Sequence, residues 1–429
     1  MKTYPQVLEY LYSQLPMYHR TGPPAYKPGL DTTLSLCLSA GNPHTHFPSV
    51  HIAGTNGKGS VSSMLASVLM ESGLRTALFT SPHLKDYRER IRVNGRMIPK
   101  SFVVSFVNRH QEVFRNLKPS FFEMTFAMAA AWFAEAQAEI AVIETGMGGR
   151  LDSTNVIRPL LSIITNIGMD HMQFLGDNPE AIASEKAGII KPGVPVIIGE
   201  SQEAIRHIFE DRAHGMQAPI SYADRGFGLH SIRQLKEGFR TAIYKRGEPF
   251  LENLYCPLGG HYQQKNLLSV LEACHQLSGM FRSIPDTAIL RGIGRVVQNS
   301  GLRGRWQVLK RKPLTICDTA HNESGISEVV KQLGEISCKR LHIVFGLAGD
   351  KDVSSILKLL PSGADYYFCR PDVPRGLPVE ALYRTAKAAG LKGIPYKGVG
   401  EAYRAALSAA SAEDLIFIGG SSFVVAEVV

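Results

Sequence analysis

One stretch near the start of the chain, VHIAGTNGKGSVSSMLASVL (residues 50–69), limits the possible folds more than any other. An apolar run of strand type, residues 49–53, leads into a glycine-rich loop, and apolar residues then recur at helical spacing up to residue 69. A glycine-rich loop that follows a buried strand and opens a helix is typical of phosphate sites in parallel α/β sheets. The stretch therefore predicts an α/β fold with an anion site at the end of this strand.

The alternation of short apolar runs and helical segments continues along the chain. Strands buried on both faces, as in parallel sheets, are predicted at residues 49–53, 75–80, 139–144, 160–165 and 195–199, and a helix over 123–136. After residues 296–309 the alternation restarts, with strands at 314–318, 341–346, 365–370 and 414–420. We therefore expect two α/β units, residues 1–297 and 298–429.

Composition limits the partners and the compartment. The 47 Lys and Arg against 38 Asp and Glu give a net charge of +9, which fits either a solvated basic surface or attraction to anionic small molecules. No basic tract with interleaved aromatic residues occurs, so no nucleic-acid partner is expected. No segment approaches the length of a membrane span, and the six cysteines lack metal spacing, which suggests a reducing compartment. We expect a cytoplasmic protein with no membrane partner.

The loop GTNGKGS departs from the common phosphate-loop pattern G-x-x-x-x-G-K-[ST]. Ile52 stands where the first glycine belongs, and the hydroxyl comes one residue late, at Ser60. The glycines let backbone N–H groups turn toward an anion, and Lys58 supplies an ammonium for terminal phosphates. The alternative is a glycine-rich turn with an exposed lysine, but the strand–loop–helix context favours phosphate binding.

Polar residues stand at or just after the ends of the next predicted strands. They are Ser81, Glu144, Asp170 and His171. Each could be an ordinary strand-end cap, but the carboxyl ends of parallel strands meet at one edge, so together they outline one crevice with the loop. A serine hydroxyl and a carboxylate suit Mg²⁺ beside phosphates, whereas His171 is read equally well as a structural histidine.

Three further polar residues each allow two interpretations. Lys186, in ASEKAGIIKPG, would by itself be a solvated lysine on a helix. Arg305 and Asp318 lie where the second unit begins; arginine suits bidentate contacts with anions, and aspartate suits a ribose hydroxyl. Their spacing alone favours a salt bridge between the units.

Several motifs occur in the order expected of one family. They are GTNGKGS, TSPHLKDYRERIRVNG, ETGMGGRLDSTN, TNIGMDHMQFLGD, SEKAGIIKPG and DTAHN. Over nearly its whole length the chain resembles the folylpolyglutamate synthase and dihydrofolate synthase family of the Mur ligase superfamily. The resemblance implies a P-loop ATPase-type domain with a mostly parallel sheet (1–297), a smaller Rossmann-like α/β domain (298–429), and ATP between them. It implies an ATP-dependent carboxylate–amine ligase that joins L-glutamate to dihydropteroate, forming dihydrofolate, and to reduced folates, through an acyl phosphate.

The resemblance also implies roles for individual residues. The nucleotide contacts would be Gly54, Thr55, Asn56, Gly57, Lys58, Gly59, Ser60, Asn266, Arg305 and Asp318. The ligands of two Mg²⁺ ions would be Ser81, Glu144, His171 and Lys186, the last as a carbamylated lysine. The substrate contacts would be Phe121, Phe122 and Asp152 for the pterin group, and His321 and Ser421 for the incoming glutamate. The expected catalytic residues are Lys58, Lys186 and His321.

The residues themselves leave alternatives to some of these roles. Two phenylalanines before a helix are often core residues, and Asp152 could cap a turn. The stretch GLRGRW departs from the usual family spelling, which leaves Arg303 as an alternative to Arg305. DTAHN has Thr319 where glycine is usual in the family.

Three other functions remain to be weighed. A peptidoglycan Mur ligase carries a whole domain ahead of the loop, and the 53 residues before Gly54 are too few for it. A nucleotide-dependent switch would need no second substrate crevice. A dedicated folylpolyglutamate synthase would use folates but not dihydropteroate; the segment PSFFEMTFAMA favours the bifunctional form. We expect the protein to be a monomer.

Overall fold

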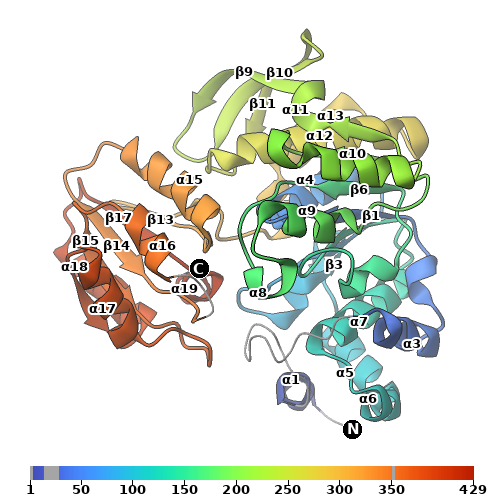
Figure 1. Ribbon diagram of the computed structural model, residues 1–429, viewed down its shortest axis with the longest axis horizontal. Helices are drawn as coiled ribbons and strands as arrows, with labels where there is room; N and C mark the ends of the chain where they lie inside the picture. Colours follow the sequence, from blue (N-terminus) through green and yellow to red (C-terminus); the bar gives the residue numbers. More distant parts are fainter. Residues whose placement is uncertain (1–2, 14–28, 350–352) are drawn as a thin grey trace.

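The computed structural model describes residues 3–13, 29–349 and 353–429, and these residues form three sheets (Figure 1). The first sheet has eight strands in the order β4-β3-β2-β5-β1-β6-β7-β8, the second has three (β11-β10-β9), and the third has six (β12-β13-β17-β14-β15-β16). In Figure 1 the six-stranded sheet and its helices form the left-hand lobe, and the other two sheets belong to the right-hand lobe. The predicted α/β class, with a large sheet and a smaller second one, is confirmed.

The eight-stranded sheet is mostly parallel. Its strands are β1 (Ser49–Ala53), β2 (Thr76–Phe79), β3 (Ile91–Val93), β4 (Arg96–Met97), β5 (Ile140–Glu144), β6 (Leu161–Ile164), β7 (Val196–Ile198) and β8 (Ile220–Tyr222). Six neighbouring strands pair in parallel, in the order β2-β5-β1-β6-β7-β8. Strands β3 and β4 add an antiparallel edge beside β2. All five strands predicted for this unit are present within one residue at each end, whereas β3, β4 and β8 are additions.

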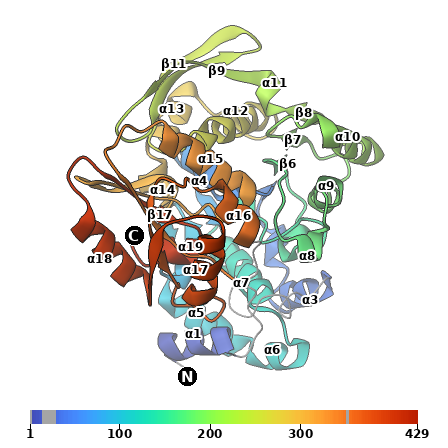
Figure 2. The ribbon, with the colours of Figure 1, turned by 60° about the vertical axis from the view of Figure 1, so that its left-hand side comes forward.

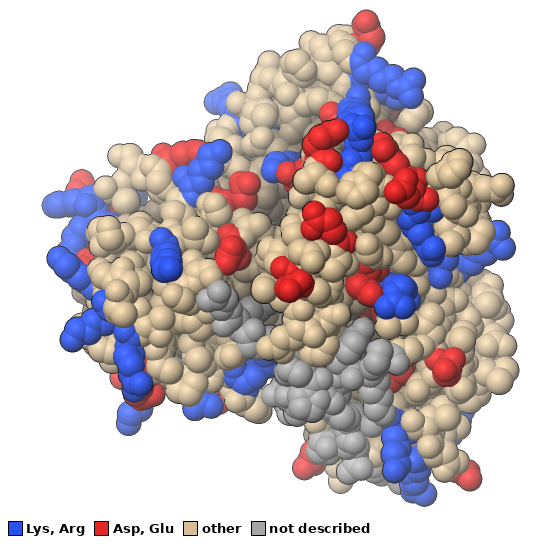
Figure 3. Space-filling model, in the orientation of Figure 1, with Lys and Arg blue, Asp and Glu red and all other residues tan. Residues whose placement is uncertain are grey.

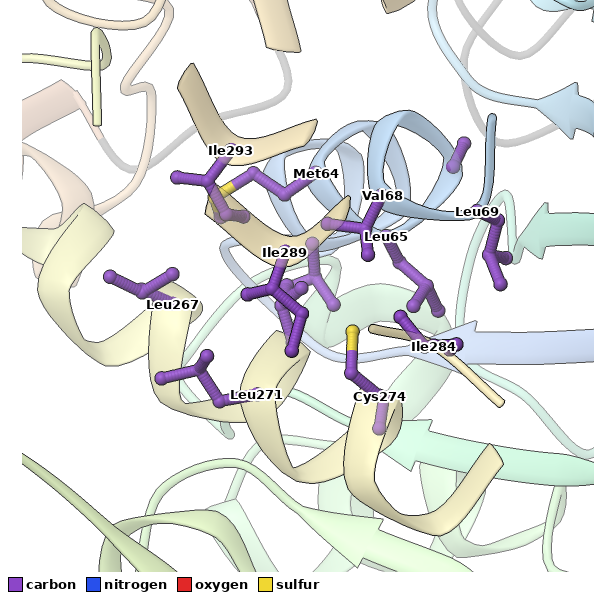
Figure 4. Packing of buried hydrophobic residues seen from close by; sticks show 14 of the residues in the cluster. Met64, Leu65, Val68, Leu69, Leu267, Leu271, Cys274, Ile284, Ile289 and Ile293 are labelled. Carbon is purple, nitrogen blue, oxygen red and sulfur yellow. The ribbon is translucent and has the colours of Figure 1, made fainter. Parts of the chain in front are cut away.

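Helices cover both faces of this sheet, which explains the continuous apolar runs. Val142 of β5 packs in the cluster around α4 (Lys58–Glu71), and its neighbour Ile143 packs in the cluster around α7 (Phe121–Glu135). On its outer side α4 packs against α12 (Tyr262–Met280) and α13 (Asp286–Gly294), as Figure 4 shows. This packing fixes the start of α12 beside the start of α4, where the phosphate loop ends.

The remaining helices of this lobe are shorter or lie at its edges. They are α1 (Tyr4–Ser13), α3 (Asp31–Ser39), α5 (Lys100–Arg109), α6 (Gln111–Leu117), α8 (Met172–Leu175), α9 (Pro179–Ala187), α10 (Arg206–Gly215), α11 (Ala223–Gly226) and α14 (Val296–Ser300). None of the described helices has the length and hydrophobicity that a membrane-spanning helix needs. The predicted division between residues 297 and 298 lies inside α14, which packs on α4; the division itself stays a prediction.

The three-stranded antiparallel sheet does not appear in the sequence prediction. Its strands are β9 (Phe227–Gln234), β10 (Phe239–Lys245) and β11 (Glu248–Cys256). One face is buried on α12 and α13, but the exposed positions carry charged and polar side chains, so no continuous apolar run marks these strands.

The six-stranded sheet is parallel except for its first strand. Its strands are β12 (Gln307–Arg311), β13 (Leu314–Cys317), β14 (Leu341–Phe345), β15 (Asp365–Cys369), β16 (Gly393–Tyr396) and β17 (Leu415–Gly419). Its helices are α15 (Glu323–Gly334), α16 (Val353–Leu359), α17 (Val379–Ala388), α18 (Val399–Ala409) and α19 (Ser422–Ala426). They pack as two clusters, with α15, α16 and α17 on one face and α18 and α19 on the other. Figure 2 brings this lobe forward.

Candidate active site

A cavity of about 360 Å³ lies between the two lobes, where the carboxyl ends of strands from both sheets meet. The predicted site residues that line it are Gly54, Thr55, Asn56, Gly57, Lys58, Gly59, Ser60, Ser81, Glu144, His171, Lys186, Asn266, Arg305, Asp318, His321 and Ser421. Phe121, Phe122 and Asp152 are not part of its lining. On the face drawn in Figure 3, basic and acidic side chains are interspersed over both lobes.

The phosphate loop connects β1 to the start of α4. Gly57, the N-cap residue of α4, has a φ of 84°, which favours glycine. A Cβ atom on Gly59 would lie 3.5 Å from Nη2 of Arg305 and 3.6 Å from Oε2 of Glu144. These are ordinary contact distances, so both charged groups lie beside the loop at the position where phosphate loops usually carry a hydroxyl.

Two lysines converge on one carbonyl of the loop. Lys58 donates from Nζ to the carbonyl oxygens of Gly54 (2.9 Å) and Thr55 (3.2 Å), and Lys186 of α9 donates to the Gly54 oxygen at 2.9 Å. Burial lowers the pKa of Lys58, although Glu144 acts in the opposite direction. Lys186 is only 3% exposed, and burial, together with the charge of Lys58, lowers its pKa to about 7. The solvated-lysine interpretation of Lys186 is therefore wrong.

Glu144 closes β5 with a carboxylate that is 3% exposed. One of its oxygens, Oε2, accepts a hydrogen bond from the backbone N of Ser81 (3.0 Å), and burial raises the pKa of the carboxyl to about 7 despite the nearby Lys58. His171, the N-cap residue of α8, lines the same cavity. Within the described ranges no group of three or more His, Cys, Asp or Glu side chains is placed to hold a metal ion. A cation here would need oxygen donors of other kinds, such as the Ser81 hydroxyl.

The C-terminal lobe touches the phosphate loop through the segment after β13. Asn322 donates from Nδ2 to Oδ1 of Asn56 (3.0 Å) and to Oδ2 of Asp170 (3.2 Å). His321 places Nε2 3.3 Å from the same Asp170 oxygen. Asp170 and Asn322 were not assigned a role from the sequence, although Asp170 was marked as a strand-end residue; only the packing of the two lobes brings them together.

Asp318 is buried directly after β13, and both of its carboxylate oxygens accept hydrogen bonds. It accepts hydrogen bonds from the Tyr262 hydroxyl (2.5 Å), the backbone N of Trp306 (2.7 Å) and the backbone N of Ala320 (2.8 Å). Burial raises the pKa of Asp318, while the bond from Tyr262 and the charge of Arg305 lower it. Tyr262 belongs to α12, so this contact also joins the two lobes.

Arg305 points into the cavity rather than onto Asp318. Its Nη1 donates to the hydroxyl of Thr319, and no ion pair within the described residues joins Arg305 to Asp318. The salt-bridge interpretation of these two residues is therefore wrong. Arg303, the alternative, is exposed and does not line this cavity.

The residues predicted for the pterin group lie behind the cavity wall. Asp152 caps the 3-10 helix Ser153–Val156, and its carboxylate also accepts hydrogen bonds from the backbone N of Gly146 (2.8 Å) and of Met147 (2.9 Å). A Cβ atom on Gly146 would lie 2.6 Å from the ring of Phe122, which is half-buried. Since Gly146 lines the cavity, the ring of Phe122 stands directly behind it.

Phe121 points the other way, into the core around α7. It is buried and packs edge-on against Tyr87 with ring centres 5.7 Å apart. Phe121 is therefore a core residue, as one interpretation of the sequence predicted. The contacts of Asp152 are those of a turn cap. Substrate roles for Phe121, Phe122 and Asp152 stay predictions.

Arg90 is a buried cation that the sequence reasoning missed. Its side chain is 1% exposed, and its Nε donates to Nδ1 of His83 at 2.7 Å. Nη1 and Nη2 have no hydrogen-bond partner among the described residues, and the guanidinium carbon lies 5.3 Å from the ring centre of Phe121. Burial lowers the pKa of Arg90 to about 10. The only sequence signal was its place in the motif TSPHLKDYRERIRVNG.

Comparisons with known proteins match both lobes. The Mur ligase middle domain family matches residues 52–274, and the family described as Mur ligase, glutamate ligase domain matches residues 304–422. A Bacillus subtilis protein named dihydrofolate synthase/folylpolyglutamate synthase is 33% identical over 367 residues, which cover 83% of this chain and 84% of that protein. A Haloferax volcanii protein named probable bifunctional folylpolyglutamate synthase/dihydropteroate synthase is 33% identical over 411 residues.

The Haloferax match covers 94% of this chain and 48% of that protein, so the chain spans about half the length of this curated relative.

Two solved structures are similar over their whole length. E. coli FolC in complex with DHPP and ADP has a TM-score of 0.86 at 29% identity, covering 100% of this chain and 97% of that one. A bifunctional folylpolyglutamate synthase/dihydrofolate synthase with Mn, AMPPNP and L-glutamate bound has a TM-score of 0.83 at 26% identity, with the same coverage.

Proposed function

Because this chain belongs to the dihydrofolate synthase/folylpolyglutamate synthase family of Mur ligases, we propose that it is an ATP-dependent carboxylate–amine ligase. It joins L-glutamate to dihydropteroate, forming dihydrofolate, and to reduced folates, forming folylpolyglutamates. The observation that carries the proposal is one cavity between the lobes. It brings the phosphate loop, the carboxylate of Glu144 and the second-lobe residues Arg305, Asp318 and His321 together.

The reaction needs ATP because a carboxylate does not react with an amine at neutral pH. Transfer of the γ-phosphoryl group to the substrate carboxylate gives an acyl phosphate; the glutamate amine attacks its carbonyl carbon, and phosphate leaves. The backbone of the loop and Lys58 hold the phosphates, and Arg305 adds a second cation at Gly59. Asn266 and Asp318 contact the nucleotide, and His321 lies on the glutamate side with Ser421.

The donors at the loop fit a divalent cation beside the phosphates. Ser81 and Glu144 would hold one Mg²⁺, and His171 with a carbamylated Lys186 would hold a second. Bound Mg²⁺ neutralises phosphate charge during phosphoryl transfer. With a pKa of about 7, the buried Lys186 is partly a neutral amine at pH 7, the form that reacts with CO₂ to give a carbamate. The relative solved with Mn, AMPPNP and L-glutamate supports a divalent cation.

We propose that dihydropteroate is a substrate in addition to reduced folates. The Bacillus subtilis relative carries both activities in its name, and E. coli FolC was solved with DHPP and ADP. Nη1 and Nη2 of the buried Arg90 guanidinium, which have no hydrogen-bond partner among the described residues, would favour an anionic substrate group nearby. A dedicated folylpolyglutamate synthase remains the second candidate, since the same site serves both reactions.

The test is phosphate release with ATP, Mg²⁺ and L-glutamate, with dihydropteroate and tetrahydrofolate assayed separately. We expect release with both substrates and none when glutamate is left out. Release with tetrahydrofolate alone would identify a dedicated folylpolyglutamate synthase. Release that needs neither pterin substrate would overturn the ligase proposal.

We also infer a cytoplasmic monomer of two domains, residues 1–297 and 298–429. Support for the compartment comes from the six cysteines, all of which are free thiols and five of which are buried. Support for the two domains comes from the change of sheet between β11 and β12.

A further inference from the structure

The hydroxyl of Ser60 has a partner that the motif does not suggest. Ser60 is the third residue of α4 and is buried, and its Oγ accepts a hydrogen bond from Nε2 of Gln263 at 3.1 Å. Gln263 is the second residue of α12, and its side chain is 0% exposed. The displaced hydroxyl of the phosphate loop is thus tied to a glutamine 203 residues further along the chain.

The amide oxygen of Gln263 accepts a hydrogen bond from Asn266. Nδ2 of Asn266 donates to Oε1 of Gln263 at 2.9 Å. The remaining amide oxygen of Asn266 faces the loop, because a Cβ atom on Gly57 would lie 2.2 Å from it. The buried Gln263 therefore donates to a residue of α4 and accepts from a residue of α12. Because it accepts from the Asn266 amide nitrogen, the amide oxygen of Asn266 is the side that faces the phosphate loop.

We propose that Gln263 is a positioning residue for nucleotide binding, acting through Asn266 and Ser60. The relay Ser60–Gln263–Asn266 holds the start of α12 against the start of α4, so that Asn266 meets the nucleotide in one orientation. Ser60 serves this relay with its hydroxyl oxygen, and the cation is left to Ser81 and Glu144. This inference rests on the proposed ATP-dependent ligation, but direct nucleotide binding can test it without the reaction.

The experiment compares ADP affinity, measured by calorimetry with Mg²⁺, in the wild type, four single variants and the double variant of Ser60→Ala with Gln263→Leu. Gln263→Leu keeps the approximate volume and removes both hydrogen bonds, Gln263→Glu keeps an acceptor for Asn266, and Ser60→Ala removes the other end of the relay. Gln276→Leu is the matched control, since Gln276 lies on the same helix and bonds a serine hydroxyl on another element, Ser221 (2.7 Å), away from the loop.

We expect Gln263→Leu to weaken ADP binding about tenfold, the equivalent of one lost hydrogen bond. Gln263→Glu should recover part of this loss, and Gln276→Leu should bind ADP like the wild type. Ser60→Ala should weaken ADP binding, and adding it to Gln263→Leu should cause no further loss, because both remove one relay. The Mg²⁺ concentration for half-maximal ligation should stay unchanged in Ser60→Ala.

Wild-type ADP affinity in Gln263→Leu would overturn the inference. So would a Ser60→Ala enzyme that needs more Mg²⁺ but binds ADP normally, because its hydroxyl would then act on the cation. If Gln263→Leu does not fold, Ser60→Ala and Gln263→Glu decide by the same criteria. A wild-type protein that binds no ADP would overturn the proposed function as well, whereas normal wild-type binding with unaltered variants overturns this inference alone.

Discussion

The phosphate-loop wall of the cavity, residues 54–60 with Lys186, differs in what its side chains bond from a back wall, the residues Phe121, Phe122 and Asp152 that lie behind the cavity lining. Lys58 and Lys186 donate to carbonyl oxygens of the loop at the edge of an open cavity, where a phosphate can compete for the ammonium group of Lys58 and a carbamate on Lys186 would face a cation. Asp152 accepts hydrogen bonds from the backbone N–H groups of the 146–147 turn and stabilises that turn. Both walls contain buried charge, but only the first presents it to the cavity.

This difference separates residues that act on a substrate from residues that build the surface it meets. An ammonium group that donates to a loop carbonyl can donate to a bound phosphate instead with little movement, and such preorganised donors stabilise transition states. A carboxylate bonded to three backbone N–H groups stabilises the turn instead. Substitutions in the first wall should therefore affect rate and nucleotide affinity, and those in the second should affect folding or the fit of the pterin ring.

The largest effect is expected for Lys58→Ala. It removes the ammonium group held at the loop, so ligation should fall by at least about a thousandfold while the melting temperature stays within a few degrees. Phosphate release and thermal unfolding measure the two quantities. Lys310→Ala, an exposed lysine on β12, is the control and should keep wild-type activity. Near wild-type ligation by Lys58→Ala would show that the loop does not bind phosphate as assigned.

Lys186 should be carbamylated, and Lys186→Ala should lose about a hundredfold in activity or more. Enzyme equilibrated with ¹³C-bicarbonate should show a carbamate resonance that is absent from Lys186→Ala and retained in Lys58→Ala. Because the pKa of Lys186 is about 7, the amine becomes protonated below that pH, and the resonance should weaken as the pH falls from 8 to 6. An active enzyme whose labelled sample shows no such resonance would contradict this assignment.

Arg305 should act on ATP across the boundary between the lobes. Arg305→Ala loses charge-assisted hydrogen bonds worth roughly 1.5–3 kcal/mol each, so the KM for ATP should rise about ten- to a hundredfold. Arg303→Ala is the matched control, because Arg303 is a neighbouring arginine that is exposed and lies outside the cavity lining. A larger effect from Arg303 than from Arg305 would reverse the assignment. An Arg305→Ala enzyme that melts early but binds ATP normally would make the residue structural.

Sequence reasoning succeeded where local pattern and motif order carry the information. Continuous apolar runs located β1 and β5 within one residue, because both faces of those strands are covered by helices. They did not locate β9 to β11, whose burial depends on packing against α12 and α13. Strand and helix patterns alone also gave no reason to expect β8 in the first sheet, because β8 is short and half-exposed.

The same limit applies to the site. Lys58 follows a strand and Glu144 ends one, both in recognisable motifs, so they could be assigned to one crevice. Gln263 and Asn322 could not, because their partners on the phosphate loop are 203 and 266 residues away and only the packed structure brings them together. The orientation of Asp152 was equally out of reach, since a capping carboxylate and a substrate-binding carboxylate look alike in sequence.

The smallest effects, and the finest test of the comparison between the walls, come from the two adjacent phenylalanines. Phe122 lies directly behind Gly146 at the cavity, whereas Phe121 packs in the core against Tyr87. Phe122→Leu should raise the KM for dihydropteroate and for tetrahydrofolate by about two- to tenfold, the value of a lost aromatic contact, with little change in melting temperature. Phe121→Leu should do the reverse, lowering the melting temperature and leaving both KM values near wild type. The two variants have the same change in composition, so they control for each other. If Phe122→Leu affects only stability, the pterin ring lies elsewhere; if it raises the KM for one substrate alone, dihydropteroate and folate do not share one ring site.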